Sequence, residues 1–314
     1  MPEKIKIESR EQWLALRHQD VTSTEISALY GLHPRMTEYE LWHRKAGPLA
    51  PEQPPTEDME WGLLHEPTVA LVAAARLGIH LVRSDVYMRL PDVHLGSSFD
   101  YFSEDGKTIV EIKTTSERYF RSHWKELRDG EFEAPIHTQI QTQGQMAVSE
   151  ICTLIIAVLV GGQKLYLSRR ERDDEVASSM KERASEFHAS LESGTPPPPD
   201  YRRDGDFILS RLKETHADET IVADAALAEK VAAFIELRTK NAEYEKTLKA
   251  MRVEILDTAK KASRIVVPSG VLYCIATKDS EGKIITPEMV GTVIGARKGS
   301  PQLRFKPTEE EETE

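Results

Sequence analysis

The stretch from Ser97 to Lys113 constrains the fold more than any other part of the chain. It reads Ser-Ser-Phe-Asp-Tyr, a turn, and then Val-Glu-Ile-Lys-Thr, which predicts two short strands. Asp105-Gly106 between them is a dipeptide typical of tight hairpin turns. Asp100 then lies on the first strand, and Glu111 and Lys113 share one face of the second because they are two residues apart. The isoleucine between them faces the opposite side, where a core requires an apolar residue.

Two carboxylates and one amine at a sheet edge are the groups that metal-dependent cleavage of phosphodiesters needs. Mg²⁺ prefers oxygen ligands and keeps several waters, so a pair of carboxylates suffices. The metal polarises the phosphate and lowers the pKa of a bound water. We expect burial and cationic neighbours to lower the pKa of Lys113, so that it orients or deprotonates this water. Taken alone, the pattern is weak, because such residues around a hairpin are more often solvated edge charges.

The composition is that of an ordinary globular protein, with 314 residues, of which 39% are hydrophobic and 30% charged. No apolar run is long enough for a membrane span, and no signal-peptide pattern precedes the first helix, so we expect a cytoplasmic protein with no membrane partner. Cys152 and Cys274 lie in apolar runs and are expected to be buried and reduced. Two cysteines are too few for a four-cysteine iron–sulfur cluster. The net charge of -11 means that DNA binding would require locally concentrated positive charge.

Punctuation by proline, glycine and charge divides the chain into four parts. We expect a catalytic domain over residues 1–194, a stiff proline-rich linker over 195–200, an extension over 201–306, and an acidic disordered tail over 307–314. In the extension, residues 223–261 predict one long helix with apolar residues at seven-residue spacing. This helix either packs on its own domain or forms an intermolecular coiled coil. A hairpin around residues 268–270 and a basic strand over 291–306 complete the extension.

Several further motifs precede and follow the carboxylates in a fixed order. They are Trp13-x3-Arg17, Val21-Thr-Ser-Thr-Glu-Ile, Tyr39-Glu-Leu-Trp42-x2-Lys45-x-Gly47, Trp61-Gly62-x3-Glu66-Pro67 and Pro135-x5-Gln141-x-Gln143-x-Gln145-Met146. Together with the Asp100/Glu111/Lys113 core, they resemble the YqaJ-type viral recombinases, which are lambda-exonuclease-like alkaline nucleases of phages and prophages. The resemblance covers residues 10–192. It implies a restriction-endonuclease-like α/β core, a mixed sheet flanked by helices, followed here by a mainly helical extension with a small β element.

The resemblance also assigns roles near the carboxylates. It implies that Asp100, Glu111 and the backbone carbonyl of Ile112 bind Mg²⁺, for which Mn²⁺ can substitute, and that Lys113 serves the attacking water. Glu66 and Gln141 are implied to complete the catalytic group. Without the resemblance, Glu66 reads as a surface glutamate of an amphipathic helix, and the glutamines read as a solvated helix face.

A second group is implied to recognise a 5′-terminal phosphate and DNA: Arg17, Ser23, Thr24 and Gln143. The planar guanidinium of arginine suits phosphate oxygens. The usual Thr-Ala-Ser of the family reads Thr22-Ser23-Thr24 here, which leaves open which hydroxyl contacts phosphate. Serine and threonine at this place also suit a helix N-cap, and both roles are compatible. The usual Pro-Asp-Gly around Asp100 reads Phe-Asp-Tyr, which indicates a changed turn.

A basic and aromatic helix is expected over residues 117–128. Arg118, Arg121 and Trp124 in it are weaker candidates for DNA contacts, with the arginines on the backbone and the ring stacked on a base. The alternative is that Phe120 and Trp124, four residues apart, form a buried stripe while the basic residues face water.

The function implied by the resemblance is Mg²⁺-dependent 5′-to-3′ digestion of linear double-stranded DNA with a 5′-phosphate. The products are 5′-mononucleotides and a 3′ overhang for a single-strand annealing protein, in a phage or prophage context within a bacterial host. The family includes ring trimers, which makes a homo-oligomer an expectation. Two alternatives remain: an endonuclease or resolvase on the same fold, and a catalytically silent DNA-binding or scaffold protein.

Overall fold

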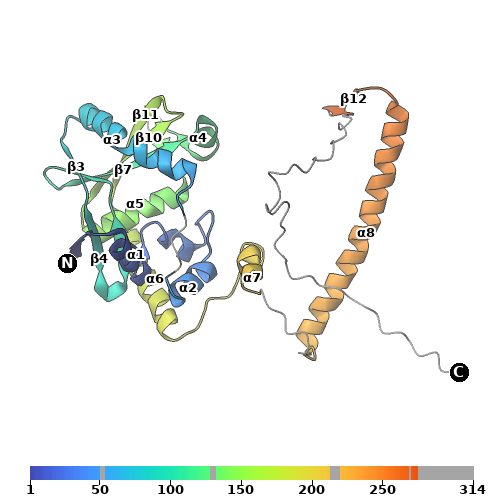
Figure 1. Ribbon diagram of the computed structural model, residues 1–314, viewed down its shortest axis with the longest axis horizontal. Helices are drawn as coiled ribbons and strands as arrows, with labels where there is room; N and C mark the ends of the chain where they lie inside the picture. Colours follow the sequence, from blue (N-terminus) through green and yellow to red (C-terminus); the bar gives the residue numbers. More distant parts are fainter. Residues whose placement is uncertain (50–53, 128–131, 213–219, 269, 275–314) are drawn as a thin grey trace, which may run out of the picture. The chain divides into compact units, whose positions relative to one another are not determined.

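A five-stranded sheet with the strand order β11-β10-β7-β6-β3 forms the centre of the fold (Figure 1). The computed structural model describes residues 1–49, 54–127, 132–212, 220–268 and 270–274. β7 and β10 run parallel, and the other neighbouring strands are antiparallel, so the sheet is mixed as the sequence predicts. The strands are β3 (Leu81–Arg83), β6 (Tyr101–Ser103), β7 (Thr108–Thr115), β10 (Thr153–Val160) and β11 (Lys164–Glu171).

The hydrophobicity of β10 explains why it lies inside this sheet. Its sequence is apolar almost throughout, which is typical of a strand that is covered on both faces. The parallel register places Ile156 opposite Glu111 and Val158 opposite Lys113. The charged residues of β7 therefore lie on a strand with a hydrogen-bonded neighbour along its full length, which gives them a rigid base.

A second sheet, with the order β1-β4-β5-β2, adjoins the first through the chain between β5 and β6. Its strands are β1 (Glu3–Lys6), β2 (Val21–Thr22), β4 (Val86–Leu90) and β5 (Leu95–Ser98), and a 3₁₀ turn, η2 (Pro91–Val93), precedes β5. The sequence predicts one strand through residues 95–102, and this is wrong: the strand breaks, and Asp100 lies in the bend. The break allows Phe99 to enter one hydrophobic cluster and Tyr101 the other.

The helix ends follow the local signals in the sequence. Ser9 caps α1 by accepting a hydrogen bond from Gln12 N, Thr37 caps α2 in the same way, and Gly31 and Gly78 end η1 and α3 with positive φ. The helical elements of this part are α1 (Arg10–Gln19), η1 (Ile26–Tyr30), α2 (Glu38–Ala46), α3 (Glu57–Leu77), α4 (Glu117–His123), α5 (Ile136–Ser149) and α6 (Asp174–Glu192).

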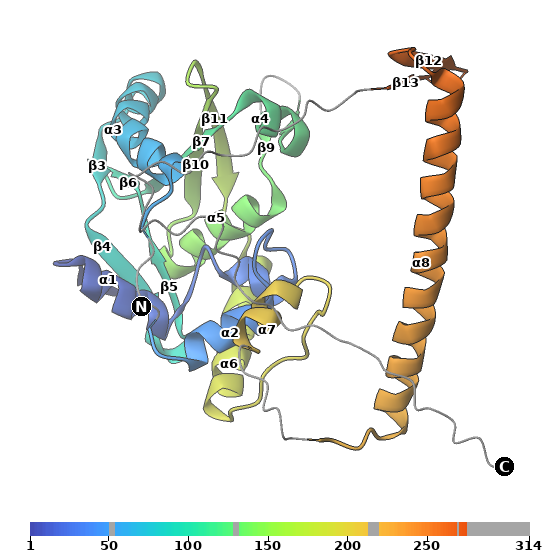
Figure 2. The same ribbon diagram turned by 45° about the vertical axis from the view of Figure 1, so that its right-hand side comes forward.

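Helices cover the central sheet from two sides (Figures 1 and 2). α3 packs on β7, β10 and β11, where its Val69, Ala70 and Ala73 join a cluster that includes Ile112. α5 lies against the other face, together with η1 and α6, around a larger cluster that includes Met146 and Ile156. Ile112 thus faces α3 as predicted, and its neighbours Glu111 and Lys113 face α5.

Two local predictions are wrong. The helix expected over residues 117–128 ends at His123, because Trp124 turns extended, packs on Phe120 and leads into the short pair β8 (Lys125–Glu126) and β9 (Phe132–Glu133). Cys152 is exposed rather than buried, since β10 begins only at Thr153, and Cys274 is half-buried. Both cysteines are free thiols.

The chain divides into two compact units, Met1–Ile208 and Leu209–Glu314. Asp204 belongs to the first unit, where it is fully buried and accepts a hydrogen bond from Thr37. The later elements are α7 (Gly205–Arg211), α8 (Ala225–Ala259), β12 (Arg264–Val267) and β13 (Gly270–Tyr273). The long helix and the hairpin are present as predicted, whereas the strand and the acidic tail expected over 291–314 lie outside the described residues. Within the described ranges, no helix combines the length and apolarity that crossing a bilayer requires.

Candidate active site

Glu111 is the centre of a hydrogen-bonded group between β7 and α5. Its Oε1 accepts hydrogen bonds from Lys113 Nζ at 2.5 Å and from Gln141 Nε2 at 2.7 Å. Its Oε2 accepts one from Gln145 Nε2 at 2.6 Å. The Glu111 side chain is 4% exposed, so three donors compensate for the burial of one carboxylate and fix its orientation.

Asp100 is held beside this group by the backbone of β7. Its Oδ2 accepts a hydrogen bond of 2.7 Å from Ile112 N. β6 pairs with β7 only at Ile109 and Val110, so the edge of β7 beyond Val110 is open to the Asp100 side chain. Because the N–H and C=O of a strand residue face the same neighbour, the Ile112 carbonyl faces this side as well. The bend after β5 and the end of the β6 pairing therefore place Asp100, Glu111 and Ile112 together.

The charges of neighbouring groups shift the pKa of Asp100 and that of Lys113. Burial, followed by the charge of Glu111, raises the pKa of Asp100 to about 8, although Lys113 and the Ile112 N–H oppose the shift. Burial acts to lower the pKa of Lys113, but the carboxylates of Glu111 and Asp100 outweigh it and raise that pKa. This direction is opposite to the predicted lowering of the Lys113 pKa, because the nearest charged neighbours of Lys113 among the described residues are anionic.

Glu66 approaches the group from α3 without a direct hydrogen bond to it. Burial raises the pKa of Glu66. The charge of Arg83 opposes this shift, and the charge of Glu111 adds to it. Arg83 Nη2 lies 3.5 Å from Glu66 Oε1, and the Glu66 side chain is 14% exposed. The structure thus places Glu66 next to the two carboxylates, partly neutralised by an arginine.

The threonine–serine segment after α1 resolves into one open hydroxyl and two enclosed ones. Thr24 is exposed, and its Oγ1 lies 3.2 Å from Arg17 Nη2. Ser23 is buried and shares a 2.7 Å hydrogen bond with Ser97. Thr22 is buried as well and donates to Glu25 at 2.8 Å. Thr24 and Arg17 are consequently the pair that solvent can reach.

A buried ion pair between Lys45 and Glu25 holds the backbone near Arg17 and Thr24 in place. Lys45 Nζ donates to Glu25 at 2.8 Å and to the carbonyls of Arg17 and Asp20 at 2.6 and 2.8 Å. Burial acts to raise the pKa of Glu25, but the charges of Lys45 and Arg17 prevail and lower it. Trp13 adds a further constraint, since the Arg17 guanidinium lies over its ring at 4.5 Å.

The remaining candidates lie away from the carboxylates. Gln143 donates to the Glu171 carbonyl at 2.9 Å and accepts from Asp173 N at 3.0 Å, so it ties α5 to the start of α6. Arg118 and Arg121 are exposed on α4. Trp124 is 8% exposed and stacks on Phe120 at 5.3 Å between ring centroids. Phe120 and Trp124 are both buried, as the buried-stripe interpretation predicts, although Trp124 follows the end of α4. The Trp124 ring is therefore too enclosed to stack on a base.

Gln145 is the member of the group around Glu111 that the sequence-based site did not include. The signal was present, since Gln145 follows Gln141 by four residues and shares its helix face. It is 1% exposed, which is unusual for a glutamine that has no functional or structural partner. Its Nε2 also lies 3.3 Å from the Ser98 carbonyl at the end of β5.

The donors fit a hard dication that keeps part of its water shell. Among the residues that the structure describes, no group of three or more His, Cys, Asp or Glu side chains is placed to hold a metal ion, so carboxylates alone would supply at most two ligands. The buried Glu111 carboxylate, the half-buried Asp100 carboxylate and one backbone carbonyl supply oxygen donors only, which disfavours soft metals and suits Mg²⁺ or Mn²⁺. A dication would also offset the negative charge that Asp100 and Glu111 share.

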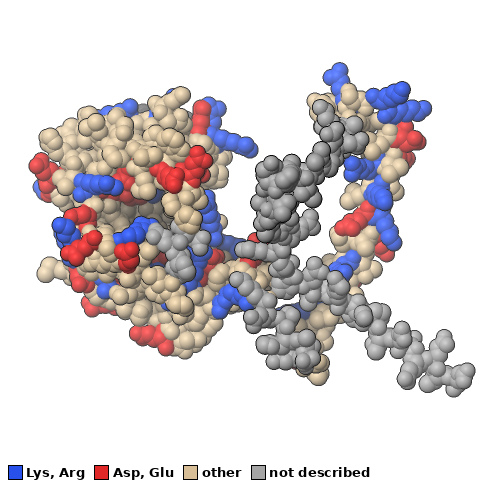
Figure 3. All heavy atoms as spheres, viewed as in Figure 1, with Lys and Arg blue, Asp and Glu red and all other residues tan. Residues whose placement is uncertain are grey.

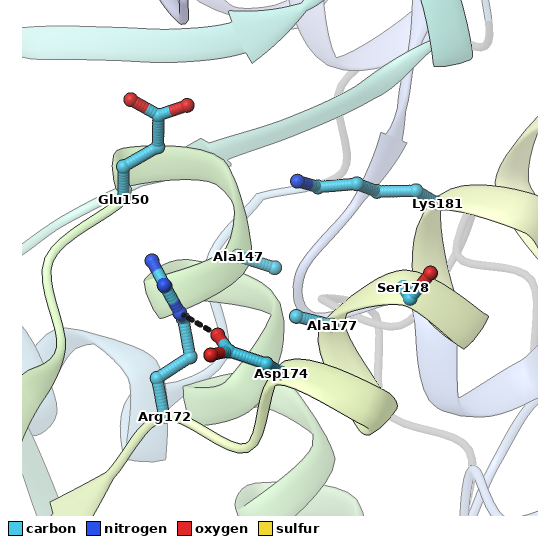
Figure 4. A pocket seen from close by; sticks show the side chains of 7 residues that line it. All are labelled: Ala147, Glu150, Arg172, Asp174, Ala177, Ser178 and Lys181. Atoms are coloured by element: carbon cyan, nitrogen blue, oxygen red, sulfur yellow. Dashed lines mark hydrogen bonds and ion pairs between the residues drawn. The ribbon is translucent and has the colours of Figure 1, made fainter.

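A separate pocket of about 400 Å³ lies between the end of α5 and the start of α6 (Figure 4). Glu150 and Lys181 lie on opposite sides of it, with Lys181 extending toward the end of α5, and Arg172 is paired with Asp174 at 2.7 Å. Two acids and two bases therefore line it, and none of the predicted site residues is among them. The mixed charge of this pocket gives no reason to place a phosphate group in it.

The mixed sheet flanked by helices confirms the predicted α/β architecture. Asp100 in the bend before β6, with Glu111 and Lys113 on β7, agrees with the restriction-endonuclease-like class that the sequence resembles. Within that class, residues 12–152 match the model of the YqaJ-like viral recombinase domain. Residues 12–152 are therefore similar to that family, as the motifs predict.

Individual relatives are more distant. The uncharacterized protein YqaJ of Bacillus subtilis strain 168 is 26% identical over 260 residues, which cover 81% of this chain and 79% of that protein. An alkaline exonuclease from Laribacter hongkongensis is 20% identical, with a TM-score of 0.48 over 59% of this chain and 93% of that chain. A phage-related exonuclease from Haemophilus somnus 129PT is 13% identical, with a TM-score of 0.41 over 58% of this chain and 99% of that chain.

Proposed function

We propose that this protein is a metal-dependent exonuclease that digests linear double-stranded DNA from 5′ to 3′. It would release 5′-mononucleotides and leave a 3′ overhang for a single-strand annealing protein. The observation that supports the proposal most is the buried Glu111 carboxylate, which Lys113, Gln141 and Gln145 hold beside Asp100. The match of residues 12–152 to a viral recombinase domain makes DNA the substrate to expect.

Asp100, Glu111 and the Ile112 carbonyl would hold Mg²⁺, or Mn²⁺ in its place. The chemistry that bound Mg²⁺ supplies is polarisation of phosphate oxygens and a lower pKa for a bound water. Glu66, which lies near enough to shift with the charge of Glu111, would complete the acidic side of the site.

Lys113 would act on the water as a cation. Its ammonium group is tied to Glu111 at 2.5 Å, and its pKa is raised, so it is protonated before a dication is bound. A protonated amine donates a hydrogen bond to the oxygen of a water or hydroxide and thereby orients it. It also stabilises negative charge on the phosphate. Gln141 and Gln145 both donate to the Glu111 carboxylate, and their role would be to keep Glu111 in one orientation.

End recognition would fall to Arg17 and Thr24. Their open guanidinium and hydroxyl groups, 3.2 Å apart, offer charge-assisted hydrogen bonds to a terminal phosphate. The glycine-free turn that carries Thr24 rests on the buried Lys45–Glu25 pair, which makes it rigid. A site that binds a 5′-phosphate would start digestion at a 5′ end and would ignore a closed circle.

One assay tests these points together. Purified protein and Mg²⁺ act on a linear duplex labelled at either end, with or without 5′-phosphate, and on a closed circle. We expect mononucleotide release from linear DNA, faster with a 5′-phosphate than without it, and none from the closed circle. The Lys113→Ala variant should be slower by about 10²- to 10³-fold, the range for loss of one group that stabilises charge. Lys107→Ala, which changes an exposed lysine in the same hairpin, should match the wild type.

The rival functions predict different results. Cleavage of the closed circle would identify an endonuclease or resolvase. DNA binding without Mg²⁺-dependent release of nucleotides would identify a silent scaffold. Equal traces of activity in the wild type and in Lys113→Ala would indicate a contaminating nuclease and would contradict the proposed site.

A further inference from the structure

α8 is a long helix without a hydrophobic core of its own. It spans 35 residues, which correspond to about 52 Å, and none of them is buried. Helices in proteins gain most of their stability from packing an apolar face. Figure 3 shows Lys, Arg, Asp and Glu side chains along α8 with other residues between them. Among the described residues, no neighbouring element buries any residue of α8.

The apolar residues of α8 follow a heptad repeat. One series, seven residues apart, contains Leu227, Phe234, Leu248 and Ile255, which are 38–65% exposed. These are the a positions. A second series three residues later, the d positions, contains Leu237, Tyr244 and Met251, which are 52–66% exposed. An alternation of three and four residues over these turns is the pattern that packs knobs into holes against another helix. We name these two series the seam.

Asn241 interrupts the seam at an a position in its middle. A single polar residue at an a position costs stability in a coiled coil, but it selects two strands, a parallel direction and one register. In a parallel pair, Asn241 faces Asn241 of the second copy, and the two amides satisfy each other. In an antiparallel pair, a positions face d positions, so Asn241 would face an apolar residue. In the single chain, its Nδ2 donates to Glu245 at 2.9 Å instead.

The charges beside the seam agree with the parallel arrangement. Lys240 precedes an a position, and Glu245 lies five residues later, which is the spacing of the salt bridges that flank parallel coiled coils. Two-fold symmetry would form this pair twice. The other flanking positions of the central heptads, such as Ala233 and Thr247, carry no charge that would repel Arg238 or Arg252 across the interface.

We propose that α8 pairs with α8 of a second copy of this chain as a parallel, in-register, two-stranded coiled coil. The pairing depends on the seam alone and is independent of the nuclease activity. The C-terminal seam residues Leu248, Met251 and Ile255 line a pocket together with Leu272 and Tyr273 of β13, so a partner helix would meet the hairpin there. The seam continues past this pocket in the N-terminal direction, where Phe234 and Leu237 are open.

Disulfide cross-linking tests direction and register. The background carries Cys152→Ser and Cys274→Ser, because both native cysteines are free. Asn241→Cys, at the seam, should convert most of the full-length chain to a covalent dimer under mild oxidation, since equivalent a positions meet only in a parallel, in-register pair. Val253→Cys, on the outer face of the same helix, should give little. Equal cross-linking of the two variants would overturn the proposal.

Molar mass tests the number of strands with matched variants. Leu248→Glu places a charge in the seam, and Val253→Glu places the same charge outside it; the two side chains are 65% and 58% exposed. Because neither is buried in the single chain, both variants should fold. In sedimentation equilibrium, the wild type and Val253→Glu should have twice the mass of Leu248→Glu. Equal masses for all three, or a ratio of three, would refute the two-stranded pair, as would an assembly held only by the nuclease unit.

Discussion

The side-chain amide of Gln145 donates a 2.6 Å hydrogen bond to Oε2 of Glu111. Gln141 and Lys113 occupy Oε1 of the same carboxylate, so Gln145 is the donor that fixes its second oxygen. A carboxylate held on both oxygens cannot rotate to suit a ligand. The orientation in which Glu111 meets its ligand is therefore set by α5.

Gln145→Leu should weaken the apparent affinity for Mg²⁺ and the nuclease rate by about 10- to 100-fold, the range for loss of a residue that orients a metal ligand. The effect should be larger at low than at saturating Mg²⁺, because the variant leaves the ligands in place. A titration of nuclease rate against Mg²⁺ measures this.

Gln139→Leu is the matched control for that change. Gln139 lies on the same helix, and its amide binds the Ala134 carbonyl at 2.7 Å and Glu133 at 3.3 Å, without contact to Glu111. Its Mg²⁺ titration should superimpose on the wild type. If the two leucine variants shifted the titration equally, the shift would reflect general loosening of α5.

Arg17→Ala should abolish most of the preference for a 5′-phosphate. A charge-assisted hydrogen bond contributes about 1.5–3 kcal/mol, which corresponds to roughly a 10- to 100-fold change in the ratio of rates on phosphorylated and unphosphorylated ends. Arg10→Ala is the comparison, because Arg10 also lies over the Trp13 ring, at 4.1 Å. Thr24→Val should lower the same ratio. Retention of the full preference in Arg17→Ala would place the phosphate elsewhere.

Glu25→Gln should make stability less dependent on acid pH. The folded protein lowers the pKa of Glu25 from its usual value, so between the two pKa values the unfolded chain binds more protons. The stability that Glu25 contributes is therefore present above its ordinary pKa and is lost as the pH falls through the lowered one.

At about pH 7, the variant should lose about 3–5 kcal/mol, because Lys45, with a side chain only 6% exposed, remains without its carboxylate. As the pH falls through the lowered pKa of Glu25, the wild type should lose this advantage and approach the variant. Urea unfolding of both proteins at about pH 7 and at a series of lower pH values measures the difference, and a gap that stays unchanged in acid would contradict the assigned titration.

The parts of the fold that short-range chemistry decides were predictable from the sequence. Ser9, Thr37 and Gly78 mark helix ends because capping needs only neighbouring residues. The pairing of Glu111 with Lys113 on one strand face follows from the two-residue period of a strand.

The parts of the fold and of the site that depend on residues far apart in the sequence were not predictable in this way. The bend at Asp100 arises because Phe99 and Tyr101 enter different clusters, built by helices that lie far away in the sequence. The pKa of Lys113 is raised by the tertiary position of Asp100 as well as by Glu111. Gln145 could be placed on a face with Gln141, but only the packing of α5 shows that this face meets Glu111.

Gly96 on β5 gives a stability test of the second sheet. A Cβ there would lie 2.1 Å from the Tyr87 hydroxyl oxygen and 2.8 Å from Asp20 Oδ2. Tyr87 and Asp20 are fully buried, and Asp20 is held by Arg89 through bonds of 2.9 and 2.6 Å, so neither group can move away freely. Gly96→Ala should therefore lower the free energy of unfolding by about 1–3 kcal/mol.

A double-mutant cycle identifies the cause. Tyr87→Phe removes the nearest oxygen but leaves the ring carbon that would lie 2.6 Å from the new Cβ. The combined variant should thus recover part of the loss, with a coupling energy of about 0.5–3 kcal/mol between the two sites. Urea unfolding of the four proteins measures it. Additive effects would show that alanine destabilises β5 in some other way, because residues that do not touch rarely couple.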